Sequence, residues 1–174
     1  MASSNFTKRS IKDSVFTSLF KEKKYSLELY KALNPDVKDV TENDIKIVTT
    51  NTTLVNDLYN DLSITVKKTV IFLMEAQSVW CIIIVWRIFL YLANYYKNYF
   101  DENGISLYKD RNVILPMPEL YVVYTGDQDI TQDEISLNDI YFGGKGQIDV
   151  KVKVITKNNY HKYFKDDNNV LVEV

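Results

Sequence analysis

Three polar residues beside two short apolar stretches have the types needed to hold a divalent cation. Asp61 opens the first stretch, and Glu75 and Gln77 follow the second. Glu75 and Gln77 are two positions apart, so in a strand their side chains point to the same face of the sheet. Mg²⁺ prefers oxygen ligands, commonly one or two carboxylates together with waters. Asp61 and Glu75 are therefore candidate metal ligands, with Gln77 beside them.

The two stretches are expected to form the hairpin that brings these residues together. Residues 61–66 alternate apolar and hydroxyl side chains, which is typical of a strand with one buried face. Residues 70–74 are apolar throughout, which is typical of a strand covered on both faces. If the strands pair through Lys67 and Lys68, the two acids lie at the same end of the hairpin.

Residues 84–100 predict a long helix directly after the candidate site. The expected core stripe consists of Val85, Ile88, Leu92, Tyr95 and Tyr99. The expected second face, with polar character, consists of Arg87, Tyr91, Asn94 and Asn98. A guanidinium can bind a phosphate through two parallel hydrogen bonds, which makes Arg87 a candidate substrate ligand.

The rest of the chain alternates helical and strand patterns. Residues 11–33 have apolar side chains at helical spacing with a polar break at Lys21–Lys24, which predicts two helices. The further strands expected are, in chain order, 45–48, 52–55, 119–124 and 147–156. Residues 130–138 are expected to be a polar linker. This order of elements predicts a mixed α/β fold.

Composition narrows the classes of function. The formal net charge of −2 gives no global attraction to polyanions, so nucleic-acid binding would have to rest on local groups. One cysteine, Cys81, and one histidine, His161, argue against a disulfide framework and against a Cys- or His-rich zinc site. The N-terminus lacks the apolar core of a signal peptide, and Arg87 interrupts the apolar run Val79–Ala93. A cytoplasmic protein with no membrane span is predicted.

In this order, these residues resemble the PD-(D/E)XK nuclease family of transposase-like proteins, which includes the bacterial recombination-promoting nucleases. The central segments that carry the resemblance are N-D-L-S-I-T-V at 60–66, E-A-Q-S at 75–78, and Arg87 followed by L-Y-L-A-N-Y-Y. The flanking segments are K-D-S-V-F-T-S-L-F, L-E-L-Y-K-A-L-N, P-M-P-E-L-Y-V-V-Y-T-G and G-Q-I-D-V-K-V-K-V. The resemblance extends over most of the chain, up to about residue 156.

The resemblance implies a restriction-endonuclease-like core, a mixed central sheet flanked by helices, over residues 1–156. A polar C-terminal tail, 157–174, stands where relatives continue with a helical region. The family's two metal-binding acids match Asp61 and Glu75, and its catalytic Lys position matches Gln77. The implied activity is hydrolysis of DNA phosphodiester bonds by an endonuclease that uses Mg²⁺ or another divalent cation, in recombination or transposition.

The resemblance also assigns roles to the remaining site residues. Arg87 matches the arginine that opens the helix after the family's site. An amide cannot act as a general base, so Gln77 is expected to hold the attacking water or a phosphate oxygen by hydrogen bonding.

One segment departs from the family and leaves a second function open. Val79–Trp86 is apolar, where relatives usually have a polar loop. An apolar run beside a substrate groove is expected to be buried. It would either cover the site or bind a partner, including a second copy of the chain. The alternative is therefore a catalytically inactive copy of the same fold that acts as a protein-interaction module through residues 79–86.

Overall fold

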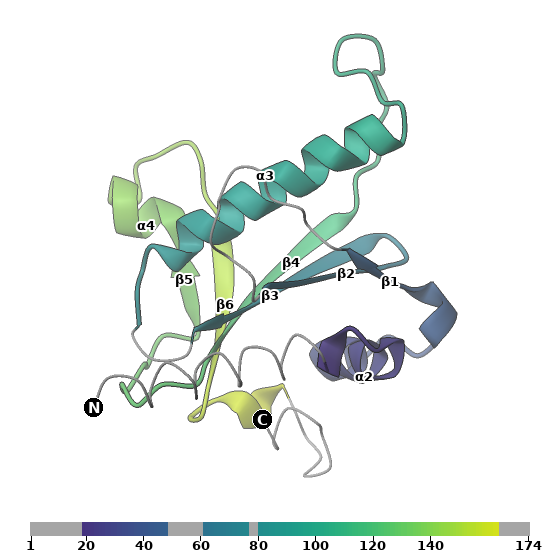
Figure 1. Ribbon diagram of the computed structural model, residues 1–174. Helices are drawn as coiled ribbons and strands as arrows, with labels where there is room; N and C mark the ends of the chain where they lie inside the picture. Colours follow the sequence, from purple (N-terminus) through teal and green to yellow (C-terminus); the bar gives the residue numbers. More distant parts are fainter. Residues whose placement is uncertain (1–18, 49–60, 77–79, 164–174) are drawn as a thin grey trace, which may run out of the picture.

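A mixed six-stranded sheet forms the centre of the protein, with helices on both faces (Figure 1). The structure, a computed structural model, describes residues 19–48, 61–76 and 80–163. Its elements are α2 (Lys23–Leu33), η1 (Glu42–Asp44), β1 (Ile45–Val48), β2 (Asp61–Val66), β3 (Thr69–Ala76), α3 (Ile84–Glu102), β4 (Met117–Tyr124), β5 (Glu134–Ser136), α4 (Leu137–Phe142), β6 (Lys151–Thr156) and η2 (Tyr160–Lys162).

The strands lie in the order β1-β2-β3-β4-β6-β5. β1, β2 and β3 form an antiparallel meander, β3, β4 and β6 run parallel, and β5 is antiparallel to β6. Parallel neighbours need a crossover connection, and α3 supplies it between β3 and β4. The predicted mixed α/β class is confirmed, as are the strand at 45–48 and the long helix. The strand expected at 52–55 lies outside the described residues.

The predicted hairpin is confirmed as a two-residue turn. Val66 pairs with Thr69, and Lys67 and Lys68 connect them. Lys67 has a φ of 53°, the only positive φ of a non-glycine residue in the described ranges. The favoured two-residue hairpin turns have positive φ at the first central position or at both, because such turns match the twist of the flanking strands.

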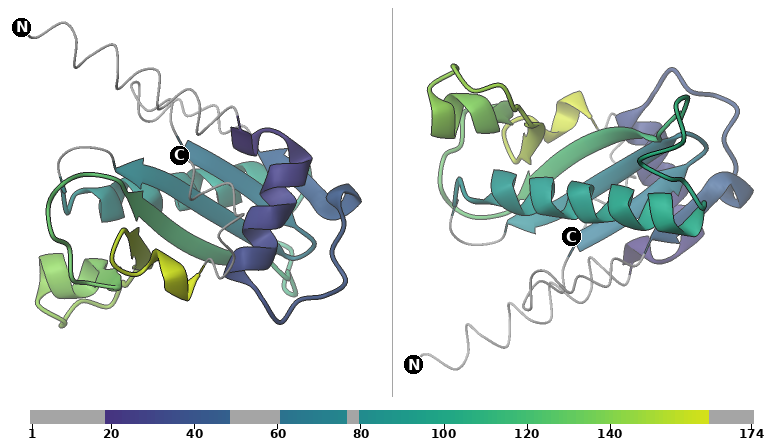
Figure 2. Two further views of the ribbon diagram at one scale, coloured as in Figure 1. Left: turned by 90° about the horizontal axis from the view of Figure 1, so that it is seen from below. Right: turned by 90° about the horizontal axis from the view of Figure 1, so that it is seen from above.

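Two apolar clusters pack on opposite faces of the sheet, one under α2 and one under α3 (Figure 2). β3 contributes to both, as its sequence predicted, because its side chains alternate. Val70 and Phe72 belong to the α3 cluster, while Ile71 and Leu73 belong to the α2 cluster. A strand buried on both faces in this way lies in the middle of the sheet.

The faces of α3 differ in part from the prediction. Its buried residues are Ile84, Val85, Ile88, Tyr91, Asn94 and Tyr95. Tyr91 continues the stripe of Ile88 and Tyr95 at spacings of three and four, so it faces the sheet instead of solvent. Leu92 and Tyr99, expected in the core, are only partly buried. The sequence misled here because tyrosine and asparagine are compatible with either side of a helix.

The polar linker expected at 130–138 is wrong. The segment contains β5 and the start of α4, and it buries three apolar residues, Ile130, Ile135 and Leu137. Ser136 caps α4 by accepting a hydrogen bond from the Asp139 amide, at 3.1 Å. A cap of this kind satisfies one of the helix's free N–H groups and is worth about 1 kcal/mol. Many polar residues in this segment make local capping hydrogen bonds, and their number makes the whole segment look like a solvent-exposed linker in the sequence.

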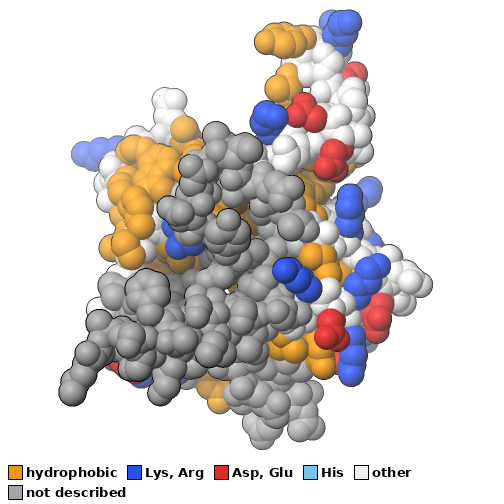
Figure 3. Space-filling model, viewed as in Figure 1, with side chains coloured by type: hydrophobic (Ala, Val, Ile, Leu, Met, Phe, Trp, Pro, Cys, Tyr) orange, Lys and Arg blue, Asp and Glu red, His pale blue; other side chains and the backbone are white. Residues whose placement is uncertain are grey.

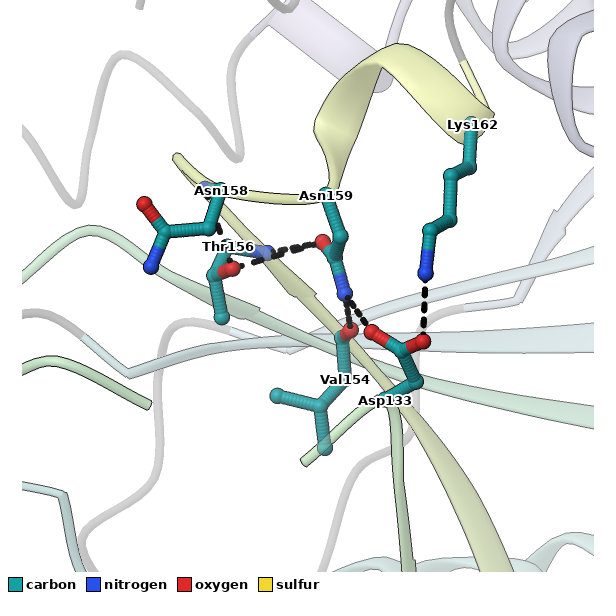
Figure 4. A network of polar contacts seen from close by, with 6 residues as sticks. All are labelled: Asp133, Val154, Thr156, Asn158, Asn159 and Lys162. Atoms are coloured by element: carbon teal, nitrogen blue, oxygen red, sulfur yellow. Dashed lines mark hydrogen bonds and ion pairs between the residues drawn. The ribbon is translucent and has the colours of Figure 1, made fainter. Parts of the chain in front are cut away.

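The first residues of the predicted polar tail are held by one buried asparagine (Figure 4). The Asn159 amide nitrogen donates to Asp133 Oδ1 at 2.7 Å and to the Val154 carbonyl at 2.8 Å. Its carbonyl oxygen accepts from the Thr156 amide at 2.7 Å. Lys162 pairs with the other oxygen of Asp133 at 2.5 Å. This network fastens η2 to the sheet; residues 164–174 lie outside the described part of the chain.

Candidate functional site

The two predicted metal ligands lie at one end of the β2–β3 hairpin. Asp61 begins β2 and is paired with Met74, and Glu75 is the next residue of β3, paired with Val123 of β4. The turn is at the other end. The backbone therefore brings the two positions together as the sequence predicted. The side chains of both acids lie outside the described part, as does Gln77 entirely.

The described neighbours of the acids belong to different faces of the sheet. Ser63, two residues after Asp61, is paired with Phe72, whose ring belongs to the α3 cluster. Leu73, two residues before Glu75, belongs to the α2 cluster. The pairing is regular up to both positions, so a metal ion shared by both carboxylates would have to be reached around the end of the hairpin.

α3 carries Arg87 to the same end of the sheet. The helix is fixed over β2 where the hydroxyls of Tyr95 and Thr65 lie 3.4 Å apart, and the Tyr95 ring meets Phe72 edge-on at 5.6 Å. Both α3 and β2 run from the end with the acids toward the turn. Arg87 precedes Tyr95 by a rise of about 12 Å, and Asp61 precedes Thr65 by about 13 Å. Half-buried Arg87 is thus at the level of Asp61.

Polar side chains fill part of the layer between α3 and β2. Tyr91 is 2% exposed and Asn94 is 6% exposed, and both follow Arg87 on one side of the helix at spacings of four and three. Ser63 is buried as well. Within the described residues, Asn94 Nδ2 has no hydrogen-bond partner. The sequence placed Tyr91 and Asn94 on a common face with Arg87, but it did not predict that this face turns inward.

The middle of the apolar run Val79–Trp86 is exposed within the single chain, so the burial expected of it would need a partner. Trp80 packs edge-on against Tyr124 at 5.6 Å, and its amide donates to Gln128 Oε1 at 3.0 Å. Cys81 is exposed, and Ile82 and Ile83 keep 44% and 49% of their surface in solvent. These three residues precede the first turn of α3 and are not on the stripe that meets the sheet. Val79 lies outside the described residues.

The exposed isoleucines border an aromatic cluster that joins α3 to α4. The Trp86 ring lies 5.8 Å from Phe89, 5.6 Å from Tyr141 and 6.5 Å from Phe142, in edge-on contacts. Tyr141 and Phe142 are themselves exposed. Hydrophobic side chains gather on this part of the surface around α4 (Figure 3). We call it the α3–α4 apolar surface.

The donor set at the hairpin end fits a hard cation such as Mg²⁺, because it offers two carboxylates and leaves positions for waters. Among the described residues, no group of three or more acidic, histidine or cysteine side chains could hold a metal ion. The carboxylates of Asp61 and Glu75 are not part of that set. The hairpin end thus remains the candidate metal centre that the sequence predicted.

Comparison with known proteins gives no match: no family model, no curated protein and no solved structure is similar to the chain. By its own geometry, the chain is a mixed α/β protein with a six-stranded sheet between helices. Over the described ranges, every helix is too short or too polar to cross a bilayer.

Proposed function

We propose that this chain is a cytoplasmic, Mg²⁺-dependent DNA endonuclease with a restriction-endonuclease-like core, acting in DNA recombination or transposition. The observation that supports the proposal is that the backbone positions of Asp61 and Glu75 lie at the same end of the central hairpin. Two carboxylates and a guanidinium are the groups that metal-assisted phosphodiester hydrolysis needs. The mixed sheet between helices agrees with the core that the sequence resemblance implies.

In this proposal, the chain's own residues position the phosphodiester. Asp61 and Glu75 would hold Mg²⁺, which when bound polarises the phosphoryl group and lowers the pKa of water. Gln77 would orient the attacking water or a phosphate oxygen by hydrogen bonding. Arg87 would bind a non-bridging phosphate oxygen pair with its planar fork. Its half-buried position strengthens that attraction, because less water screens it.

The first test is cleavage of supercoiled plasmid DNA in the presence of Mg²⁺. Asp61→Asn and Glu75→Gln remove one charge each while keeping the side-chain shape, so each should lower the cleavage rate at least 100-fold. Asp36→Asn, at an exposed acid in the loop after α2, is the matched control and should cleave like the unchanged protein. Equal rates in all four proteins would rule out the assignment of the acids.

A second candidate function is favoured by the exposure of Ile82 and Ile83. A catalytically inactive copy of the fold could use the α3–α4 apolar surface to bind a second copy of the chain. Large exposed apolar patches often mark interaction sites, since their burial releases ordered water.

Sedimentation velocity tests this second function. The unchanged protein should form a dimer, and Ile83→Asp should shift it to the monomer because a buried carboxylate opposes association. Leu107→Asp, at a residue that is 72% exposed in a different region, is the control and should leave the dimer intact. A protein that is monomeric with and without Ile83→Asp contradicts the interaction module, and calorimetric binding of Mg²⁺ by the unchanged protein would favour the nuclease.

A further inference from the structure

A pocket of about 310 Å³ lies at the far end of α3 from the hairpin acids. It opens between the C-terminal half of α3 and the edge strand β1. Its volume is at the lower limit for pockets that bind small organic molecules. Its walls combine aromatic rings, amides and charged groups, which is unlike the purely apolar α3–α4 surface.

The strand wall consists of Lys46, Val48 and Thr65. Ile45 and Ile47 alternate with the first two and belong to the α2 cluster, so Lys46 and Val48 face α3. Lys46 is paired with Thr65 of β2, which puts both on the same face. The methylene stem of Lys46 can line the pocket while its ammonium group stays at the rim.

The helix wall is built on two tyrosines. Tyr95 is held by the Thr65 hydroxyl at 3.4 Å, and the Tyr99 ring lies 6.2 Å from it with the ring planes only 32° apart. Tyr95 is only 6% exposed and backs the pocket, so the half-buried Tyr99 ring is the aromatic surface that a ligand can contact. Burial raises the pKa of Tyr95, so its phenol stays protonated at neutral pH. A planar ligand can stack on the Tyr99 ring.

Hydrogen-bonding and charged groups surround the aromatic wall. Asn98 and Asn103 both line the pocket, and Asn103 donates from its amide nitrogen to the Tyr99 carbonyl at 2.8 Å, which leaves its oxygen and its second N–H for a ligand. Lys46 and Glu102 are at opposite walls. Within the ranges that the structure describes, neither takes part in an ion pair. An aliphatic ligand would leave these groups without partners, and a bare anion would face the carboxylate.

We propose that this pocket binds a nucleotide, with the base stacked on Tyr99, whose ring Tyr95 supports from the core. The amides of Asn98 and Asn103 would pair with the polar edge of the base, and Lys46 would meet the phosphate. Aromatic stacking of this kind is worth about 1–3 kcal/mol per base. The site goes beyond the proposed endonuclease, because it requires neither the two acids nor a metal ion.

The test is a titration of the full ¹⁵N-labelled chain, in EDTA, followed by NMR. The probes are AMP, a short single-stranded oligonucleotide and inorganic phosphate. AMP, the oligonucleotide or both should move the side-chain amide signals of Asn98 and Asn103 in a saturable way. Tyr99→Ala and Asn98→Ala should each weaken binding about tenfold or more. Tyr108→Ala and Asn112→Ala, in the exposed loop after α3, are the matched controls and should bind normally.

The arms of the experiment give distinct answers. Tighter binding of AMP assigns a free nucleotide to the pocket, and tighter binding of the oligonucleotide assigns a single strand. Two results would overturn the proposal. One is that inorganic phosphate binds as tightly as AMP and the oligonucleotide. The other is that neither nucleotide probe shifts the signals at concentrations up to about 10 mM. Asp61→Asn should bind AMP unchanged, so a chain that never cleaves DNA can still pass this test.

Discussion

Lys67 is strained by the hairpin that brings the acids together. Its φ of 53° is in the left-handed region, where a β-carbon costs roughly 1–2 kcal/mol and glycine pays nothing. Lys67→Gly should therefore raise the free energy of unfolding by about 0.5–1 kcal/mol, after the entropy of the freer unfolded chain is deducted. Urea denaturation followed by circular dichroism measures it. Lys68→Gly, without the positive φ, should destabilise, and the same sign for both would contradict the strain.

The carboxyl group of Asp133 makes the free energy of unfolding depend on pH in the acid range. Hydrogen bonds from Asn159 and then from Lys162 hold the pKa of its carboxyl below the usual value. A group whose pKa is lowered by folding stabilises the protein above its unfolded pKa, about 3.9, and loses that contribution as pH falls through the folded pKa. Asp133→Asn should therefore lower stability at pH 7 and flatten its decline below about pH 4. Denaturation across pH, beside Asp127→Asn, provides the check; parallel acid declines in all three proteins would refute the linkage.

The helices and strands that could be predicted from the sequence are those whose apolar residues recur at a regular spacing. β2, β3 and the long helix α3 were predicted because alternation and 3.6-residue spacing are visible within a few residues. β5 and α4 were not, because their apolar residues have no regular spacing and their positions depend on contacts distant in sequence. The Ser136 hydroxyl donates to Asp149 at 2.7 Å, across thirteen positions. Such a contact has no signature in a short window.

For the candidate site, the sequence predicted where Asp61 and Glu75 lie on the backbone, but it did not predict which neighbouring side chains are buried or exposed. Asp61 and Glu75 occupy neighbouring positions at one end of the hairpin because a two-residue turn fixes the register. The inward turn of Tyr91 and Asn94, and the exposure of Ile82 and Ile83, depend on how α3 is rotated against the sheet. That rotation is set by packing across both layers, since each side of α3 carries residues that suit either environment.

At the scale of the whole molecule, three regions with different chemistry lie along α3. The hairpin acids and Arg87 are at one end, and the tyrosine-lined pocket is at the other. The α3–α4 apolar surface is at the start of the same helix. One rigid element thus borders all three regions, and a change in its tilt would move them together.

The spacing of residues along α3 also predicts the length of a polynucleotide that could contact both ends of the helix. Arg87, at the level of Asp61, and Tyr99, in the pocket, are separated by about 18 Å along the helix axis, at 1.5 Å per residue. Stacked nucleotides rise 3.4 Å each along one strand, so this span corresponds to about five nucleotides. If one polynucleotide occupies the acid end and the pocket together, the shortest oligomer with full affinity should be near that size. The length of polynucleotide that the protein covers would then be set by the spacing of the two regions along α3.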